Sequence, residues 1–255
     1  MKARTLVIGD IHGGLRALKQ VLERAEVTSA DKLVFLGDYA DGWSETAQLI
    51  DFLIELNQQQ QCVFMIGNHD LWLMDWLEIG KEDQIWLSNG GLESIGSYQH
   101  YSAGQKRNHF LFFQNMRGYW IDGTQGPGDE VGDQRLFLHA GFTSHHGPHR
   151  ETFPSNFSWD RTLWETAIAV AEDMDENHIY YPRRLKLFKE IFIGHTATTR
   201  YKTHLPIKAQ NVWNMDTGAG FGGKLSIMNV HTKEYWQSDF VNLLYPDERG
   251  RREGG

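Results

Sequence analysis

The pentapeptide GDIHG at residues 9–13 constrains the fold and chemistry of this chain more than any other stretch. It follows the apolar run TLVI, which is typical of a strand buried on both faces, and it precedes a segment with leucines at helical spacing. A plain turn uses Gly and Asp but has no need of His12. A carboxylate and an imidazole at a strand-to-helix junction indicate a functional site if suitable partners follow along the chain.

The same strand–turn–helix pattern recurs. Apolar strands are predicted at 32–38 and 62–70, with an amphipathic helix at 45–57 between them, and further strands at 135–141 and 191–196. Strands that alternate with helices predict βαβ units and a largely parallel sheet. The last part of the chain alternates in the manner of antiparallel hairpins.

Every predicted buried strand ends in a glycine with an acid, an amide or an imidazole. The motifs are GDIHG, GDYAD, GNHD, HAG and GHT. Each alone is weak evidence, but five at strand ends are not coincidence. The carboxyl ends of strands in open α/β sheets line the ligand crevice, so these side chains should converge. Their oxygens and nitrogens suit divalent ions, and two such ions bridged by a carboxylate can hold a phosphate and activate a water molecule.

Composition sets the limits of this interpretation. The 255 residues, 40% hydrophobic and 23% charged, fit one domain, expected at 1–246, with a disordered tail at 247–255. The net charge of −8 argues against nucleic acid and anionic membranes as partners. The single cysteine, Cys62, and the lack of a targeting or membrane-spanning segment predict a cytoplasmic protein.

The ordered motifs resemble those of the calcineurin-like metallophosphoesterases. The nearest pattern is that of the bacterial serine/threonine phosphoprotein-phosphatase branch: GDxHG, GDxVDRG, GNHE, HGG or HAG, and GHT. Bacterial members also resemble the chain at WLSNGGLESIGSY (86–98), SWDRTLW (158–164) and DTGAGFGGKLS (216–226). The resemblance implies an α/β fold: an αββα sandwich of two mixed sheets flanked by helices, with a dinuclear metal site at the strand C-termini.

The resemblance also implies a role for each motif residue. The first metal would be held by Asp10 and His12, and Asp38 would bridge the two ions. The second would be held by Asn68, His139 and His195. His69 would protonate the leaving oxygen, and Asp41 would pair with it, fixing its tautomer and favouring its protonated form. Manganese is the first choice for both ions, with iron, zinc and magnesium as alternatives.

The chain departs from the family pattern after GDYAD. Gly42 and Trp43 stand where GDxVDRG has an arginine that grips phosphate and a glycine. Arg161 in SWDRTLW is then the best candidate for binding the substrate phosphate. Trp43 could stack a nucleobase, although packing on the scaffold is favoured. GNHD has Asp70 in place of the usual Glu, a milder change.

A cluster of histidines follows the HAG motif: His145, His146 and His149. A third metal site is one interpretation of it. A rim loop is favoured, because the Gly-Pro break prevents a rigid array of ligands.

The predicted function is metal-dependent hydrolysis of a phosphomonoester by direct attack of a hydroxide that bridges the two metals. The first interpretation is a serine/threonine protein phosphatase acting on phosphorylated protein or a small phosphoester. The alternative is a symmetrical diadenosine-tetraphosphate-type nucleotide hydrolase. A non-catalytic phosphate-binding module ranks last, because neither a ligand nor the general acid is missing.

Overall fold

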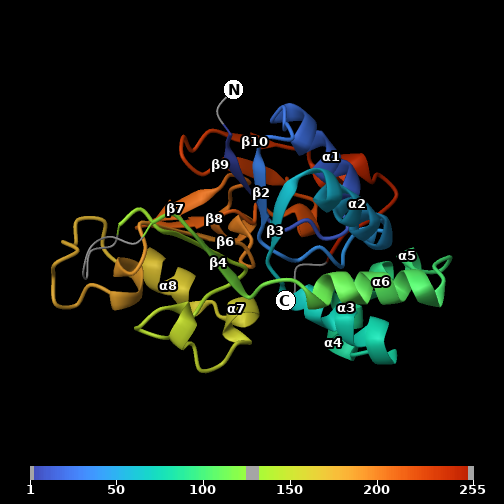
Figure 1. Ribbon diagram of the computed structural model, residues 1–255, viewed down its shortest axis with the longest axis horizontal. Coiled ribbons are helices and arrows are strands. Elements are labelled where there is room, and N and C mark those ends of the chain that lie inside the picture. The colour runs from blue at the N-terminus through green and yellow to red at the C-terminus, as the bar shows by residue number, and fades with distance from the viewer. Residues whose placement is uncertain (1–2, 125–131, 252–255) are drawn as a thin grey trace.

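The structure is a computed structural model that describes residues 3–124 and 132–251. Two sheets lie face to face in the middle of the molecule, with helices on the outside (Figure 1). Both sheets have five strands, and both mix parallel with antiparallel pairs. This arrangement confirms the predicted αββα sandwich.

The first sheet carries the N-terminal motifs. Its strand order is β10 (Tyr235–Gln237), β9 (Ser226–Asn229), β1 (Thr5–Ile8), β2 (Lys32–Phe35) and β3 (Gln61–Phe64). Strands β1, β2 and β3 are parallel, whereas β9 and β10 run antiparallel to their neighbours. Helices α1 (Leu15–Arg24) and α2 (Thr46–Gln59) make the crossovers between the parallel strands and bury their apolar faces in the same core cluster.

The second sheet carries the later motifs. Its order is β4 (Tyr119–Asp122), β5 (Arg135–Leu138), β6 (Glu190–Ile193), β8 (Val212–Asn214) and β7 (Ile207–Ala209). Strands β5, β6 and β8 are parallel, and the antiparallel strands β4 and β7 form the two edges. Each sheet therefore offers three parallel strands whose carboxyl ends can line one site.

The remaining helices lie outside these two crossovers. They are α3 (Asn68–Ile79), α4 (Gln84–Trp86), the π-turn Leu87–Gly91, α5 (Leu92–Ser97), α6 (Ala103–Gln114), α7 (Asn156–Trp159), α8 (Thr162–Ala169) and α9 (Val241–Leu244), with 3₁₀ turns at Pro148–Arg150, Arg183–Lys186, Thr198–Tyr201 and Ala219–Phe221. Figure 1 shows α3 to α6 grouped beside the first sheet and α7 and α8 beside the second. Among the described residues, no helix is long and apolar enough to cross a membrane.

A buried layer between the sheets holds them together. It contains Val7, Val34 and Met65 from the first sheet and Phe137 and Phe192 from the second. The rings of Phe137 and Phe192 stack with centroids 5.1 Å apart. Alternate strand residues point to opposite faces, so the neighbours of these residues pack outward against the helices. The near-continuous apolar runs in the sequence reflect this burial on both faces.

The GNHD motif lies at the start of a helix, so the strand predicted at 62–70 is too long. Strand β3 ends at Phe64, and α3 begins at Asn68. The Asp70 carboxylate accepts a hydrogen bond from the backbone N–H of Gly67 (2.8 Å) and so satisfies a donor at the start of the helix. In the predicted tail, residues 247–251 are described and pack against the domain, whereas residues 252–255 lie outside the described residues.

Candidate active site

The six predicted metal ligands meet where the two sheets present the carboxyl ends of their parallel strands. Asp10 follows β1, Asp38 follows β2, His139 follows β5 and His195 follows β6. The full set is Asp10, His12, Asp38, Asn68, His139 and His195; all are buried except His195, which is partly exposed. The structure thus brings together residues from five separate motifs, as the strand-end argument predicts. Their role as ligands stays a prediction.

Asp38 lies at the centre of this cluster. Two groups have all their ligand atoms within 4.8 Å of one another: Asp10, His12 and Asp38, and Asp38, His139 and His195. Asp38 belongs to both groups, as a bridging carboxylate must. Its Oδ2 lies 3.6 Å from Nε2 of His12 and 3.4 Å from Nε2 of His139.

Two buried ligand atoms have no hydrogen-bond partner. They are Oδ1 of Asp10 and Nε2 of His195. Buried polar atoms are normally paired, because leaving one unpaired costs free energy. A divalent ion on each atom would remove that cost. The residues present therefore fit a dinuclear metal centre.

Two histidines are held in the orientation that metal binding needs. Nδ1 of His12 donates to the backbone oxygen of Ala40, and Nδ1 of His139 to that of Leu36, both at 2.9 Å. A proton on Nδ1 leaves the lone pair of Nε2 free for a metal ion. Backbone carbonyls thus fix the tautomer of both rings.

The shifted pKa values of the buried carboxylates also indicate that the cluster suits cations. Burial raises the pKa of Asp10 well above its usual value, and the nearby Asp216 carboxylate adds to the rise. For Asp38, burial alone would raise the pKa, but the surrounding imidazoles, His139 foremost, bring it well below its usual value. Several buried carboxylates this close together are stabilised when positive charge lies among them.

The motif glycines make room for these carboxylates. A Cβ on Gly194 would lie 1.9 Å from Oδ1 of Asp10, and one on Gly67 would lie 2.1 Å from Oδ1 of Asp38. Any side chain at either position would displace the carboxylate. The glycines of the GHT and GNHD motifs therefore let the carboxylates of Asp10 and Asp38 approach the backbone closely.

Four site residues also hold left-handed backbone conformations. The φ angles are +52° at His12, +53° at Asp38, +74° at Asp41 and +67° at His195. Such conformations cost free energy in non-glycine residues and concentrate at functional sites.

His69 and Asp41 form a buried pair beside the cluster. Nδ1 of His69 lies 2.6 Å from Oδ2 of Asp41, whose carboxylate also accepts hydrogen bonds from Nε1 of Trp86 (2.8 Å) and Oγ of Ser94 (2.7 Å). Trp86 and Ser94 come from the segment 86–98 that resembles bacterial members. Sequence reasoning singled out that segment without assigning a role to either residue.

Burial shifts the two pKa values of this pair in opposite directions. Burial, followed by the charge of Arg251, lowers the pKa of His69 well below its usual value, whereas burial raises the pKa of Asp41 to about 7. In both residues burial disfavours the charged form. The role of the pair as a proton donor stays a prediction.

A cavity with a volume of ≈ 230 Å³ lies beside the cluster. Its walls include Asp38, Asn68, His69, Trp72, Ile85, Asn89, Trp159, Arg161, His195 and Arg251. Arg161 is one of these wall residues, and its Nη1 donates to Oγ1 of Thr196 (2.7 Å) and to the backbone oxygen of His195 (3.3 Å); its role in phosphate binding stays a prediction. Trp72, Trp159 and Arg251 were not predicted.

Trp43 does not reach this cavity. Its side chain is fully buried, stacks on Tyr245 with ring centroids 5.1 Å apart, and donates from Nε1 to the backbone oxygen of Ala219. Packing on the scaffold is therefore the correct interpretation, and a stacking role toward adenine is wrong. His145, His146 and His149 are exposed, and none joins a metal-ligand group within the described residues.

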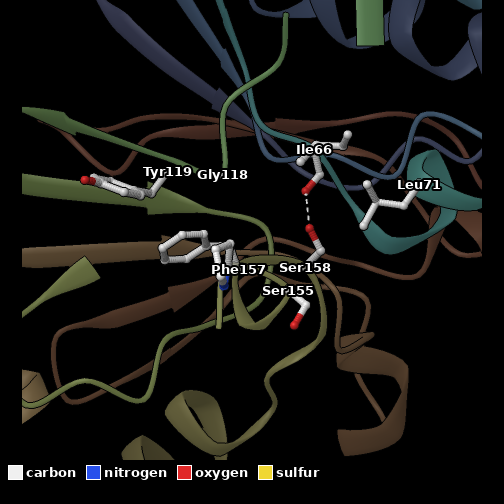
Figure 2. Close-up of a pocket in the computed structure, with 8 residues that line it drawn as sticks. Ile66, Leu71, Gly118, Tyr119, Ser155, Phe157 and Ser158 are labelled. Carbon is white, nitrogen blue, oxygen red and sulfur yellow. Dashed lines mark hydrogen bonds between the residues drawn. The ribbon is translucent and has the colours of Figure 1, made fainter. Parts of the chain in front are cut away.

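A second cavity of ≈ 400 Å³ has a largely apolar wall that includes Ile66, Leu71, Tyr119 and Phe157 (Figure 2). Within it, Oγ of Ser158 donates to the backbone oxygen of Ile66 (2.8 Å). Among the described residues, no predicted site residue lines this cavity, and its walls hold no charged side chain for a phosphate.

Comparison with known proteins agrees with the geometry. The family model for calcineurin-like phosphoesterases matches residues 3–212. The symmetrical bis(5'-nucleosyl)-tetraphosphatase of Pseudomonas entomophila (strain L48) is 37% identical over 274 aligned positions, which cover 92% of this chain and 93% of that protein. The protein of the same name from Pseudomonas putida (strain GB-1) is 38% identical over 71 residues, only 28% of this chain and 24% of that protein.

Solved structures show the same fold. A metallophosphoesterase from Sphaerobacter thermophilus superposes with a TM-score of 0.54 over 93% of this chain and 89% of that one, at 16% identity. The predicted class of enzyme, a dinuclear metallophosphatase, is confirmed. The chain belongs to the calcineurin-like phosphoesterase family.

Proposed function

We propose that this protein hydrolyses dinucleoside tetraphosphates symmetrically. The observation that carries the proposal is the match along 92% of the chain to a relative named for that activity. The relatives favour this alternative over the protein-phosphatase interpretation. Symmetrical cleavage breaks the central P–O–P bridge: water adds its oxygen to one phosphorus, and the bridging oxygen leaves with the other half. The products are two nucleoside diphosphates.

The rim of the active-site cavity suits a nucleobase. Trp72 and Trp159 both line it, and their rings make an edge-to-face contact with centroids 5.1 Å apart. The ring of Trp72 lies edge-to-face with that of His69 at 5.0 Å, so the aromatic rim directly adjoins the reacting centre. Trp159 is 42% exposed. An exposed indole beside a phosphate site offers a stacking surface for a base.

The charged side chains suit the polyphosphate. Arg161 forms no ion pair with a carboxylate in the described part of the chain, so its guanidinium is available to phosphate oxygens. Two divalent ions on the six ligands would supply positive charge to the phosphoryl oxygens and acidify a bound water. His69, held by Asp41, would deliver a proton from Nε2 to the leaving oxygen.

Product analysis tests the proposal directly. We expect the manganese-loaded enzyme to convert diadenosine tetraphosphate to ADP alone, with kcat/KM well above the values for a phosphoserine peptide and p-nitrophenyl phosphate. AMP and ATP in equal amounts would mean asymmetrical cleavage. A kcat/KM that is higher for the phosphopeptide than for diadenosine tetraphosphate would support the protein-phosphatase interpretation instead.

A rim variant tests the nucleobase site separately. Trp159→Ala should weaken dinucleotide binding by about 1–3 kcal/mol, the value of one stacked base, and so raise KM. Turnover of p-nitrophenyl phosphate, which has no base, serves as the control and should change little. Equal losses on both substrates would place Trp159 in the support of the catalytic centre instead.

A further inference from the structure

Arg251 enters the active-site cavity from the C-terminal segment, far in sequence from every motif. It lines the same cavity as Asp38, His69 and Arg161. Its Nη1 lies 3.0 Å from Nε2 of His12, a residue 239 positions earlier in the chain. The cavity therefore has two guanidinium groups among its walls.

The segment that carries Arg251 is anchored to the domain at several points. The backbone N–H of Arg251 donates to the oxygen of Gly220 (2.7 Å), and the guanidinium carbon lies 4.7 Å from the ring centroid of Phe221. Three residues earlier, Glu248 accepts hydrogen bonds from the backbone N–H (2.9 Å) and Oγ (2.6 Å) of Ser44. These contacts fix the backbone of the segment and so place the Arg251 side chain beside the candidate metal ligands.

The guanidinium lacks an anionic partner. Within the described residues, Arg251 forms no ion pair with a carboxylate, and its Nε is buried without a hydrogen-bond partner. Arg161 and Arg251 are both partly buried and line one cavity. Two like charges on the walls of one cavity favour the binding of an anion between them.

The contact with His12 does not supply that anion. Nδ1 of His12 donates to Ala40, so Arg251 donates to the lone pair on Nε2. This is the lone pair that a metal ion would take. With the metal bound, the N–H donors of Arg251 are left for another acceptor in the cavity.

The Arg251 side chain packs against Gly42, the residue that replaces the arginine of the family pattern. A Cβ on Gly42 would lie 3.0 Å from Cγ of Arg251, so the Arg251 side chain fills the space beside that residue. The φ angle of Gly42 is +104°, a conformation that side-chain-bearing residues rarely adopt. This chain thus has no arginine at position 42 and places one from its C-terminal segment against the same spot.

We propose that Arg251 is a second phosphate-binding residue, which grips the non-bridging oxygens of the substrate opposite Arg161. The guanidinium fork matches the geometry of phosphate oxygens, and two arginines on separate segments would hold one phosphate from two directions. The assignment rests on phosphoester chemistry and not on the identity of the nucleotide, so inorganic phosphate can test it apart from the proposed function.

The experiment measures phosphate binding to manganese-loaded protein by titration calorimetry, with manganese content determined by elemental analysis. Arg251→Ala should weaken phosphate binding about ten- to a hundredfold, the usual effect of losing a charged hydrogen bond, with both metals retained. Arg249→Ala is the matched control. It removes the same charge from an exposed position two residues away and should leave phosphate binding and turnover unchanged.

Two further variants keep the test sharp. Arg251→Met keeps an unbranched apolar stem without the guanidinium charge, so it separates loss of charge from loss of packing by the stem; it should behave like Arg251→Ala. Arg251→Lys should recover part of the affinity. Unchanged phosphate affinity in Arg251→Ala would overturn the proposal. A gain in manganese affinity and turnover would also overturn it, because Arg251 would then obstruct metal binding by His12. A loss of manganese binding together with phosphate binding would overturn it as well.

Discussion

The carboxylate of Asp70 accepts a hydrogen bond from the backbone N–H of Asp38 at 2.8 Å, which ties the third motif to the second. The same carboxylate accepts from the N–H groups of Gly67 (2.8 Å), Tyr39 (2.8 Å) and Ala40 (3.2 Å). Asp70 is fully buried. It holds in place the loop that carries Asp38, so it shapes the candidate metal site without lying among the predicted ligands.

Replacing Asp70 should therefore damage both stability and metal binding. Asp70→Ala strands several buried N–H donors, each costing about 1–3 kcal/mol, so we expect a loss of at least 3 kcal/mol in the free energy of unfolding. Asp70→Asn keeps the shape and one acceptor and should lose less. Urea denaturation with and without manganese measures both effects. An unchanged urea midpoint in Asp70→Ala would show that the loop carrying Asp38 keeps its conformation without the Asp70 carboxylate.

The proposed bridging role of Asp38 leads to a separate prediction. Asp38→Asn removes the one carboxylate that belongs to both candidate metal groups. We expect bound manganese to fall from two ions per chain, and turnover to fall with it, because a neutral amide bridges two dications poorly. Elemental analysis after gel filtration provides the count. Two retained ions with near-normal turnover would assign the bridge to another group.

The pair of His69 and Asp41 predicts a dependence on the leaving group. The alkoxide of phosphoserine needs a proton to leave, whereas p-nitrophenolate does not. His69→Asn should keep both metals and slow a phosphoserine peptide about 10²–10⁴-fold, with a much smaller effect on p-nitrophenyl phosphate. Asp41→Asn should act in the same direction, because Asp41 orients the ring. Equal losses on the two substrates would point to ground-state positioning.

Arg161 predicts a loss of phosphate affinity. Arg161→Ala should lower kcat/KM by about ten- to a hundredfold and weaken inhibition by phosphate to a similar degree, with metal content unchanged. Arg200→Ala is a suitable control, because Arg200 lies near enough to lower the pKa of Arg161 but does not line the cavity. If Arg161→Ala changes neither phosphate inhibition nor turnover, the role of the guanidinium is structural and limited to its hydrogen bonds with Thr196 and His195.

The sequence predicted the candidate metal cluster well for a physical reason. Each ligand comes within a few residues of a strand end, and parallel strands end at a common edge, so local patterns imply a shared position. Gly194 and Gly67 in the later motifs added to the signal, because a residue without a side chain lets a carboxylate come this close to the backbone.

The residues that sequence reasoning missed depend on contacts between distant segments. Arg251 meets His12 across 239 positions, and no local pattern predicts that encounter. The packing of Trp43 was expected, but its partner Tyr245 comes from the far end of the chain and could not be named from the sequence. The start of α3 at Asn68 was missed because GNHD was assigned to the end of the strand, whereas the helix begins inside that motif.

The last prediction concerns stability against acid and depends on Asp31, outside the active site. Arg4 donates to both carboxylate oxygens of Asp31, from Nε (3.0 Å) and Nη2 (2.7 Å), and the N–H of Thr28 donates as well (2.9 Å). The Asp31 side chain is only 3% exposed. The hydrogen bonds from Arg4 hold the pKa of Asp31 well below its usual value of about 3.9.

A carboxyl whose pKa is lower in the folded state stabilises the fold at pH values above its unfolded pKa, and that contribution is lost as the pH falls toward the folded pKa. Asp31→Asn should therefore reduce the free energy of unfolding by about 1.5–3 kcal/mol at pH 7, and the difference from the wild type should shrink below about pH 4. Asp239→Asn is the control. Asp239 also pairs with an arginine, Arg24 at 2.7 Å, but its side chain is 52% exposed, so the variant should change little at any pH. Denaturation of the three proteins between pH 3 and pH 7 makes the comparison, and a difference for Asp31→Asn that stays constant over this range would mean that packing, and not the charge of Asp31, is what the substitution removes.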